Sequence, residues 1–340
     1  MSKMNDNKAE KSNSANKFLN KAFFQKYLII FVLIAMFIVL TGMNSNFLTL
    51  NNVLNLLTQT SIYGILALGL FIVLVSKGID LSVGSTLAFA GITAGTISQT
   101  QEAVDKIFPS LGMSPLFVTI LVALIIGGLI GLINGLFIAY TGIPPFIATL
   151  GSQIAIRGAA LMISNGKPVS NINPAINVLG DRLFGFLPVP VLIYVGVIVF
   201  MWILMNYTTF GKSIYAIGGN VEAAEISGIK VKRNIVIVYI ISGVFAGLSS
   251  LIYIGRTGGS IQPAAGTMYE TTAIAAATIG GTSHSGGIGT VWGVVVGALI
   301  LGTLTNGFTL LGIDAYVQQI IQGVIIIGAV VLDMRKNKRA

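Results

Sequence analysis

The chain of 340 residues contains no cysteine and a single histidine. The lack of cysteine excludes a disulfide framework, a thiol nucleophile and a thiolate metal site, and one histidine leaves little for a histidine metal cluster. Charged residues are scarce too, at 9% of the chain against about 25% in a typical soluble domain. We therefore expect no metal site and no catalytic residue in this chain.

Long apolar runs fill the chain instead. Apolar residues make up 54% of it and the mean hydropathy is +0.88. Because about 20 apolar residues are needed to cross a bilayer, these runs predict an all-α, polytopic membrane protein of about ten transmembrane helices. The predicted helices lie near residues 27–43, 55–76, 80–99, 116–141, 145–164, 190–206, 234–254, 271–283, 288–311 and 315–332.

Charge divides the chain into one transmembrane domain, residues 27–332, and two basic tails, residues 1–26 and 333–340. The N-terminal tail is rich in lysine and asparagine, which predicts a disordered segment resting on anionic lipid. The positive-inside rule then places both termini in the cytoplasm of a protein of the cell membrane, as an even number of spans requires. Since the net charge of +9 is concentrated in these tails, we expect no nucleic-acid partner.

Two of the predicted helices, near 80–99 and 271–283, are dense in Gly, Ser and Thr. Non-helical backbone at membrane depth must be covered by protein or line a water-filled cavity, so broken or re-entrant helices that face inward are predicted here. Elsewhere, small residues at four-residue spacing (Gly127, Gly131 and Gly135) indicate close packing of two helices.

A weak internal sequence repeat suggests two related halves. Asn134-Gly135, followed by a Gly-Ile pair at 142–143, recurs at 306–307 and 312–313. The two segments run in opposite directions in the predicted topology. Inverted repeats with a site near the midplane are a common transporter plan, although four matched residues in a glycine-rich chain can also be chance.

Polar side chains in the apolar runs are the candidates for a translocation path or gate. A charge such as Asp80, between two apolar segments, is expensive unless it is paired or hydrated. Asp80 is predicted to cap the next helix, and direct contact with a transported molecule is the alternative. The full set of path or gate candidates is Asp80, Ser82, Ser85, Asn134, Gln262, Glu270, Thr282 and Asn306. Arg157 is given a structural role, and His284 that of a hydrogen-bonded loop residue.

A polar segment, residues 206–233, separates two apolar stretches and contains a predicted short surface helix. Asn220 suits its N-cap, Glu222 suits the positive end of the helix dipole, and Gly228 suits a left-handed end. Ala223 and Ala224 would leave one face nearly flat, so that another protein could dock; an ordinary loop is the alternative.

The residues Gly211, Lys212 and Ser213 imitate the end of a P-loop. Asn206 stands where the first glycine of that motif belongs, and no buried strand precedes it. We therefore expect no nucleotide site and no cofactor on this chain.

Four segments in order, residues 78–85, 144–151, 206–233 and 280–289, resemble the membrane permease of ribose-type ABC sugar importers. The resemblance runs from about residue 27 to the C-terminus. It implies a non-enzymatic permease subunit that carries a monosaccharide, ribose or a similar sugar, across the cytoplasmic membrane. It also implies a cytoplasmic ABC ATPase that holds ATP and Mg, an extracytoplasmic sugar-binding protein, and a second permease subunit, with a homodimer favoured.

The same resemblance makes residues 207–233 the loop that couples the permease to the ATPase. The residues it implicates are Gly218, Gly219, Asn220, Glu222, Ala223, Ala224, Ser227 and Gly228.

The aromatic residues are scattered along the chain and predict no stacked platform for a sugar ring.

Two other classes of function were weighed. An ion-coupled secondary sugar transporter needs a coupling carboxylate inside the bundle, for which Asp80 and Glu270 are the candidates. An intramembrane enzyme is disfavoured, since no paired carboxylates, Ser-Lys pair or histidine-rich metal cluster stands out in the sequence.

Overall fold

A computed structural model describes residues 28–104 and 106–337 of the chain. Most of this part is helical, and its only sheet is a hairpin of β1 (Arg182–Leu183) and β2 (Leu187–Pro188). The predicted all-α fold is confirmed. The predicted disordered tail, residues 1–26, lies outside the described residues.

Every one of the ten predicted ranges contains a helix. The helices are an N-terminal helix Leu28–Met43, α2 (Leu50–Val75), α3 (Val83–Thr96), α4 (Leu116–Thr141), α5 (Pro145–Ile163), α6 (Val189–Tyr207), α7 (Thr209–Gly219), α8 (Val221–Ile226), α9 (Val231–Arg256), α10 (Tyr269–Ile279), α11 (Val291–Leu310) and α12 (Ala315–Asn337), with the 3₁₀ helix η1 (Pro174–Leu179). In the described part of the chain, six are long and apolar enough to cross a membrane: α2, α4, α5, α6, α9 and α11. The number of ten complete spans stays a prediction.

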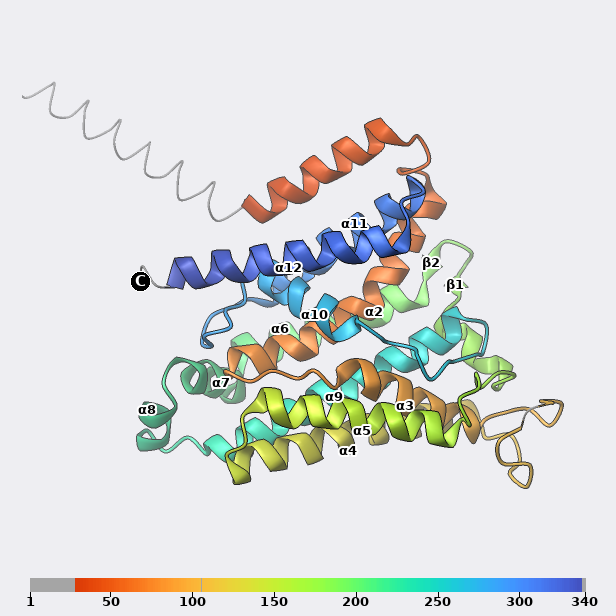
Figure 1. Ribbon diagram of the computed structural model, residues 1–340, viewed down its shortest axis with the longest axis horizontal. Helices are drawn as coiled ribbons and strands as arrows, with labels where there is room; N and C mark the ends of the chain where they lie inside the picture. The colour runs from red at the N-terminus through yellow and green to blue at the C-terminus, as the bar shows by residue number, and fades with distance from the viewer. Residues whose placement is uncertain (1–27, 105, 338–340) are drawn as a thin grey trace, which may run out of the picture.

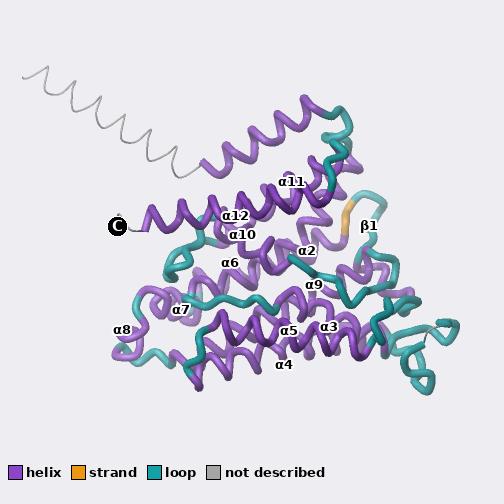
Figure 2. The backbone as a smooth tube through the Cα atoms, in the orientation of Figure 1, coloured by secondary structure: helices purple, strands orange, loops and turns teal. Residues whose placement is uncertain are grey.

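The helices α3 and α10, with 14 and 11 residues, are the two for which a broken helix was predicted. At 1.5 Å per residue they are about 21 and 17 Å long, which is short of the roughly 30 Å of a bilayer core. Each is preceded by a loop, residues 76–82 and 257–268, that enters the bundle (Figure 2). Asp80 and Ser82 in the first loop are each 1% exposed, so this backbone is covered by protein as expected.

The beginnings of α3 and α10 meet inside the molecule. A side chain at Gly84 would collide with the carbonyl oxygen of Gly266 and with a carboxylate oxygen of Glu270. From this point the two short helices run in opposite directions. The residues after α3 lead to Thr100, which donates its N–H to Asn171, whereas the residues after α10 lead to Gly287, which donates its N–H to Val75 at the far end of α2.

The order of helices repeats in the two halves of the described chain. Residues 28–163 and 189–337 each hold five long or short apolar helices, and the third is the short one in both. Because α3 and α10 run in opposite directions, the arrangement is that of an inverted repeat. The weak internal repeat in the sequence predicted this inverted relationship of the two halves.

The helices α4 and α9 pack closely along their length. Side chains at Gly127 and Gly131 would collide with the carbonyl oxygens of Gly243 and Tyr239, and a Cβ at Gly135 would lie 2.8 Å from the Cα of Val236. The predicted packing role of the three glycines is confirmed, since only a missing side chain lets the backbones approach this far.

The bundle has two ends, which we name by the elements found there. At the α8 end lie α7, α8 and the C-terminal end of α12, and at the hairpin end lie β1, β2 and the loop residues 97–104 and 106–115 (Figure 1). In the same view α11 and α12 lie on one side of the bundle and α4 and α5 on the other.

Candidate functional site

The carboxylate of Asp80 is held inside the bundle by three hydrogen bonds. Its Oδ1 accepts from the backbone N–H of Ser82 at 3.0 Å and from the Ser82 hydroxyl at 2.6 Å, and its Oδ2 accepts from the Ser242 hydroxyl at 2.9 Å. Ser242 lies near the middle of α9, so this cluster is midway along the spanning helices.

The predicted helix cap at Asp80 is wrong. The residue before α3 is Ser82, and no side-chain cap bond is present there. Asp80 lies two residues before the N-cap position of α3, so its carboxylate accepts the N–H of Ser82 rather than an N–H group of the first helical turn. Ser85, one of the path or gate candidates, donates its hydroxyl to the carbonyl oxygen of Ser82 at 2.9 Å.

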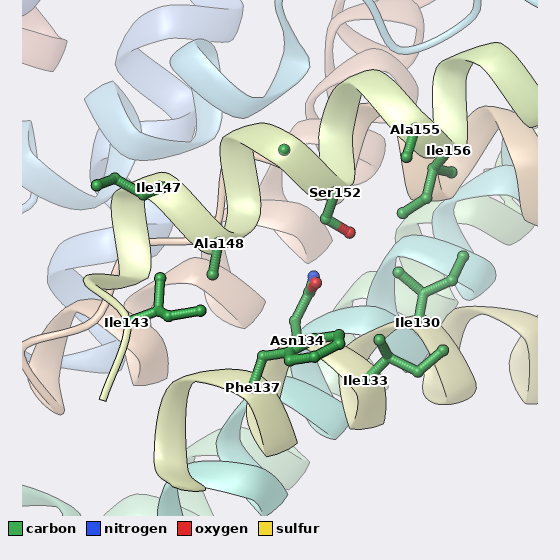
Figure 3. A pocket seen from close by; sticks show the side chains of 11 residues that line it. Ile130, Ile133, Asn134, Phe137, Ile143, Ile147, Ala148, Ser152, Ala155 and Ile156 are labelled. Carbon is green, nitrogen blue, oxygen red and sulfur yellow. The ribbon is translucent and has the colours of Figure 1, made fainter. Parts of the chain in front are cut away.

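Asn134 joins the same cluster from α4 by donating to the Ser82 hydroxyl at 2.9 Å. It also lies at the base of a groove of about 510 Å³ between α4 and α5, where Ser152 points toward it (Figure 3). The rest of the groove is lined by apolar side chains such as Ile133, Phe137 and Ile147, which are exposed on the outside of the bundle. These walls offer a hydroxylated molecule few hydrogen bonds.

Glu270 is the counterpart of Asp80 at the start of α10 and is 5% exposed. Its Oε1 accepts a hydrogen bond of 3.1 Å from Gln153 of α5, while Oε2 has no hydrogen-bond partner. Arg157 interacts electrostatically with Glu270 and donates to the carbonyl oxygens of Pro263 and Ala265, the latter at 2.7 Å. The structural role predicted for Arg157 is confirmed, because it holds the loop that leads to α10.

The remaining path candidates lie apart from these two carboxylates. Gln262 is exposed in the loop before α10, and Thr282 is buried in the loop after it. Asn306 of α11 exchanges two hydrogen bonds of 2.9 Å with Asn52 of α2. His284 shares a hydrogen bond of 2.8 Å with Thr278, which fits the loop role predicted for it.

The aromatic residues are less scattered than the sequence suggested. The rings of Tyr63 and Tyr269 meet edge to face with centroids 4.7 Å apart. The Tyr63 and Tyr269 side chains also share a hydrogen bond, and Tyr253 and Arg256 of α9 lie within electrostatic range of Tyr269. The sequence missed this cluster because its members come from three different helices.

The predicted surface helix is α8. The side chain of Asn220 accepts from the N–H of Ala223 at 3.0 Å, Glu222 lies in the first turn, and Gly228 is left-handed with φ +82°. The local structure predicted for this segment is confirmed, and the sequence missed only α7, which precedes it.

The flat face predicted from two alanines is half wrong. Ala223 is exposed, but Ala224 is buried against its own chain. Of the six residues of this helix, Glu222, Ala223, Glu225 and Ile226 are exposed, and the Ile226 side chain is 89% exposed.

The segment that carries α8 touches the end of α2, from which the loop 76–82 leads to α3, and the loop that follows α10. Gly218 packs directly on the carbonyl oxygen of Val75 at the end of α2 and on the backbone N–H of Gly287, and a side chain there would collide with both. The Tyr215 hydroxyl of α7 donates to the carbonyl oxygen of Gly289 at 2.9 Å. A displacement of α7 and α8 would therefore reach both short helices through backbone contacts.

The apparent P-loop is excluded by its surroundings. Gly211, Lys212 and Ser213 lie within α7, where Gly211 donates its N–H to the capping side chain of Thr208 at 3.1 Å. A phosphate cradle needs a strand and an open loop before the helix, and neither is present at this place.

An inverted repeat of apolar helices, with a surface segment that contacts the end of α2 and the loop after α10, is compatible with a membrane transport subunit. The chain belongs to the family described as the branched-chain amino acid transport system / permease component, which matches residues 52–330. No solved structure matches the chain.

Three similar proteins are named for the sugars they import. The chain is 40% identical to a galactose/methyl galactoside import permease protein of Escherichia coli K12, covering 94% of this chain and 98% of the relative. It is 40% identical to a ribose import permease protein of Bacillus subtilis 168, covering 92% of each. It is 37% identical to a D-allose transport system permease protein of Escherichia coli K12, covering 93% and 94%. The resemblance found in the four sequence segments is thus confirmed.

Proposed function

We propose that this chain is the membrane-spanning subunit of an ABC importer for a monosaccharide. The observation that carries the proposal is similarity over more than nine-tenths of both chains to permeases named for galactose, ribose and allose. Identity is 40% both to a galactose permease and to a ribose permease, so it favours neither a hexose nor a pentose. Ribose or a similar sugar stays the prediction.

The energy for transport comes, on this proposal, from a cytoplasmic ABC ATPase that holds ATP and Mg, while this chain binds no cofactor. The docking element is α8 with its neighbours Gly218, Gly219, Ser227 and Gly228. The support is the exposed tip at Ile226 and the contacts of Gly218 with the bundle. ATP binding would close the ATPase subunits, move α8, and shift the permease from inward to outward access.

The α8 end is the cytoplasmic end in this proposal. Lys77, Lys212, Lys230, Lys232 and Arg233 lie in or beside the segment that carries α7 and α8, and the last helix carries its basic residues toward the same end (Figure 1). Both termini are then cytoplasmic, as the positive-inside rule requires. The sugar-binding protein meets the hairpin end, and a second permease subunit, an identical copy by preference, completes the channel.

The ion-coupled alternative finds less support. A coupling carboxylate must gain and lose a proton or a sodium ion in contact with water, whereas Asp80 is 1% exposed and accepts three hydrogen bonds from its own chain. The relatives named above are import permeases of a family of transport systems with separate permease components.

Co-purification tests the proposal. The chain is extracted from its native membrane in mild detergent, and the proteins that accompany it are identified by mass spectrometry. We expect a P-loop ATPase with the unaltered chain and its loss with Ile226→Glu. The matched control is Val104→Glu, which places the same charge on a residue 97% exposed in the loop at the hairpin end. Equal recovery of the ATPase with both variants would contradict docking at α8.

A further inference from the structure

A polar stripe runs along α2 from the hairpin end to the middle of the bundle. It consists of Asn52, Asn55, Gln59 and Tyr63, whose spacing of three, four and four residues places them on one face of the helix. From Leu56 to Val75 only Leu57, Gln59 and Tyr63 of this helix are not buried. The α2 polar stripe is therefore the side of α2 that the rest of the chain leaves accessible.

Each side chain of the stripe has a polar or aromatic partner. Asn52 exchanges hydrogen bonds with Asn306, and Asn55 accepts one of 3.0 Å from Arg182. Gln59 donates to the Tyr63 hydroxyl at 3.3 Å, and the Tyr63 ring meets that of Tyr269. The stripe thus begins at the hairpin end and ends beside Tyr269, the first residue of α10, which precedes Glu270.

Partly exposed polar groups continue beside the stripe on other helices. Thr271 and Thr272 of α10 are half-buried, and Gln322 of α12 donates to the Thr305 hydroxyl of α11 at 3.3 Å. Polar side chains at membrane depth are unfavourable against lipid and are placed toward a cavity or another protein. This face differs in that respect from the lipid-facing surface of the bundle.

The helix α4 provides the comparison. Its exposed face carries Phe117, Leu121, Ile125, Leu129 and Ile133, every one apolar and each 47–63% exposed. The two helices have the same length of 26 residues, and both pack on α9. The helix α4 exposes an apolar stripe and α2 exposes a polar one, so the two exposed faces are suited to different surroundings.

We propose that the α2 polar stripe, ending at Tyr63 and Tyr269, is the surface along which the sugar passes from the hairpin end to the middle of the membrane. This inference rests on the proposed function and assigns the path to residues. Amides and phenols offer donors and acceptors to sugar hydroxyls, and tyrosine rings offer an apolar surface to sugar C–H groups.

The chemistry of the stripe also distinguishes substrate classes. An amino acid carries two full charges, and each needs an opposite charge when it leaves water. The four stripe residues carry no ionised group at neutral pH, and a neutral polyhydroxylated molecule needs none. The stripe residues themselves thus suit a sugar, and the ionised groups nearest to them are Arg182, which bonds Asn55, and Glu270, which follows Tyr269.

The absence of cysteine from this chain makes the test direct, because labelling of this chain can come only from the introduced thiol, and the unaltered chain controls for thiols of other subunits. Single variants Gln59→Cys and Tyr63→Cys are treated, in cells that contain the whole importer, with a permanently charged methanethiosulfonate reagent. Only the thiolate reacts, and a thiol in apolar surroundings keeps its proton, so we expect labelling at least about tenfold faster than at a lipid-facing thiol. Labelling of either position should also stop sugar uptake.

The matched controls are Phe117→Cys and Leu121→Cys on α4. Ser249 of α9 bonds the carbonyl oxygen of Ile62, and Gly247 packs on that of Ala123, so Tyr63 and Leu121 lie at similar depth. Equal labelling rates on both helices would overturn the path, as would labelling of the stripe that leaves uptake intact. Stripe thiols that do not react would also overturn the proposed path. If these thiols then oxidise to a disulfide between two copies of the chain, the stripe is a contact between subunits from which water is excluded. Uptake that needs no ATPase in the unaltered chain would instead overturn the proposed function.

Discussion

The backbone N–H of Gly287 donates a hydrogen bond of 2.8 Å to the carbonyl oxygen of Val75. This bond ties the loop after α10 to the end of α2, and Gly218 of α7 packs against both of its atoms. The three backbones meet where the segment bearing α8 joins the transmembrane bundle. Movement of that segment must either carry the Val75–Gly287 pair along or break this contact.

Replacement of Gly218 by alanine should separate ATP hydrolysis from transport. The added methyl group has no room between Val75 and Gly287, and such overpacking costs about 1–3 kcal/mol. Because α8 itself is unchanged, we expect the ATPase to remain bound while uptake falls about tenfold, the equivalent of about 1.4 kcal/mol. Uptake and ATPase activity are measured together in proteoliposomes.

Gly219→Ala is the control for this prediction, since a side chain at Gly219 meets nothing within 4 Å. It alters the same helix end by the same methyl group. Because both glycines border the docking element, recovery of the ATPase is measured for both variants. Equal effects of Gly218→Ala and Gly219→Ala would show that the contact with Val75 and Gly287 carries no motion.

Gly84→Ala should destabilise the protein at the meeting point of α3 and α10. The methyl group would collide with the carbonyl oxygen of Gly266 and with the Glu270 carboxylate, for a cost of about 1–3 kcal/mol. Gly158→Ala on α5 has open space and should be neutral or stabilising, because alanine favours a helix by up to about 1 kcal/mol. Thermal unfolding in detergent compares the two, and an equal Tm would refute the close contact.

Asp80→Ala should lower the free energy of unfolding more than Asp80→Asn. Alanine leaves the Ser82 and Ser242 hydroxyls without their acceptor in a buried place, which costs about 1–3 kcal/mol or more, whereas the asparagine oxygen can still accept one of these bonds. Denaturation of the two variants measures the difference. If Asp80→Asn folds normally but loses all ATP-driven uptake, the carboxylate has a transport role rather than a structural one.

Burial raises the pKa of the Tyr215 phenol above its ordinary value of 10.0. Because the folded state holds this proton more tightly than the unfolded state, the stabilisation is complete below pH 10 and is lost as the pH rises through the folded-state pKa. Tyr215→Phe removes the bond to Gly289, should cost about 1 kcal/mol at neutral pH, and should flatten this alkaline loss. The free energies of unfolding of the two proteins are compared between about pH 7 and about pH 11, a range that includes the ordinary phenol pKa of about 10.

Local patterns of sequence predicted those parts of the fold that depend on local chemistry. Apolar run length located the helices, and Asn220 with Gly228 marked both ends of α8. Glycine spacing found the contact of α4 with α9. The density of small residues singled out the two short helices α3 and α10, because backbone that cannot be hydrogen-bonded in lipid has to be covered.

Contacts between distant segments were beyond such patterns. Ser242 stands 162 residues from Asp80, and no local spacing links them. Tyr63 and Tyr269 are likewise brought together by the packing of α2 and α10. The burial of Ala224 and the exposure of Ile226 depend on how α8 rests on α7, which composition alone does not fix.

Sugar uptake into proteoliposomes is the most direct test of the central claim. The chain is reconstituted with its co-purified ATPase and a sugar-binding protein, and labelled ribose, galactose and allose are offered in turn. Our account predicts uptake of at least one sugar that requires ATP on the side of α8, persists without any proton or sodium gradient, and survives in the double variant Asp80→Asn with Glu270→Gln. Uptake that follows an ion gradient without ATP, and disappears in that variant, would contradict it.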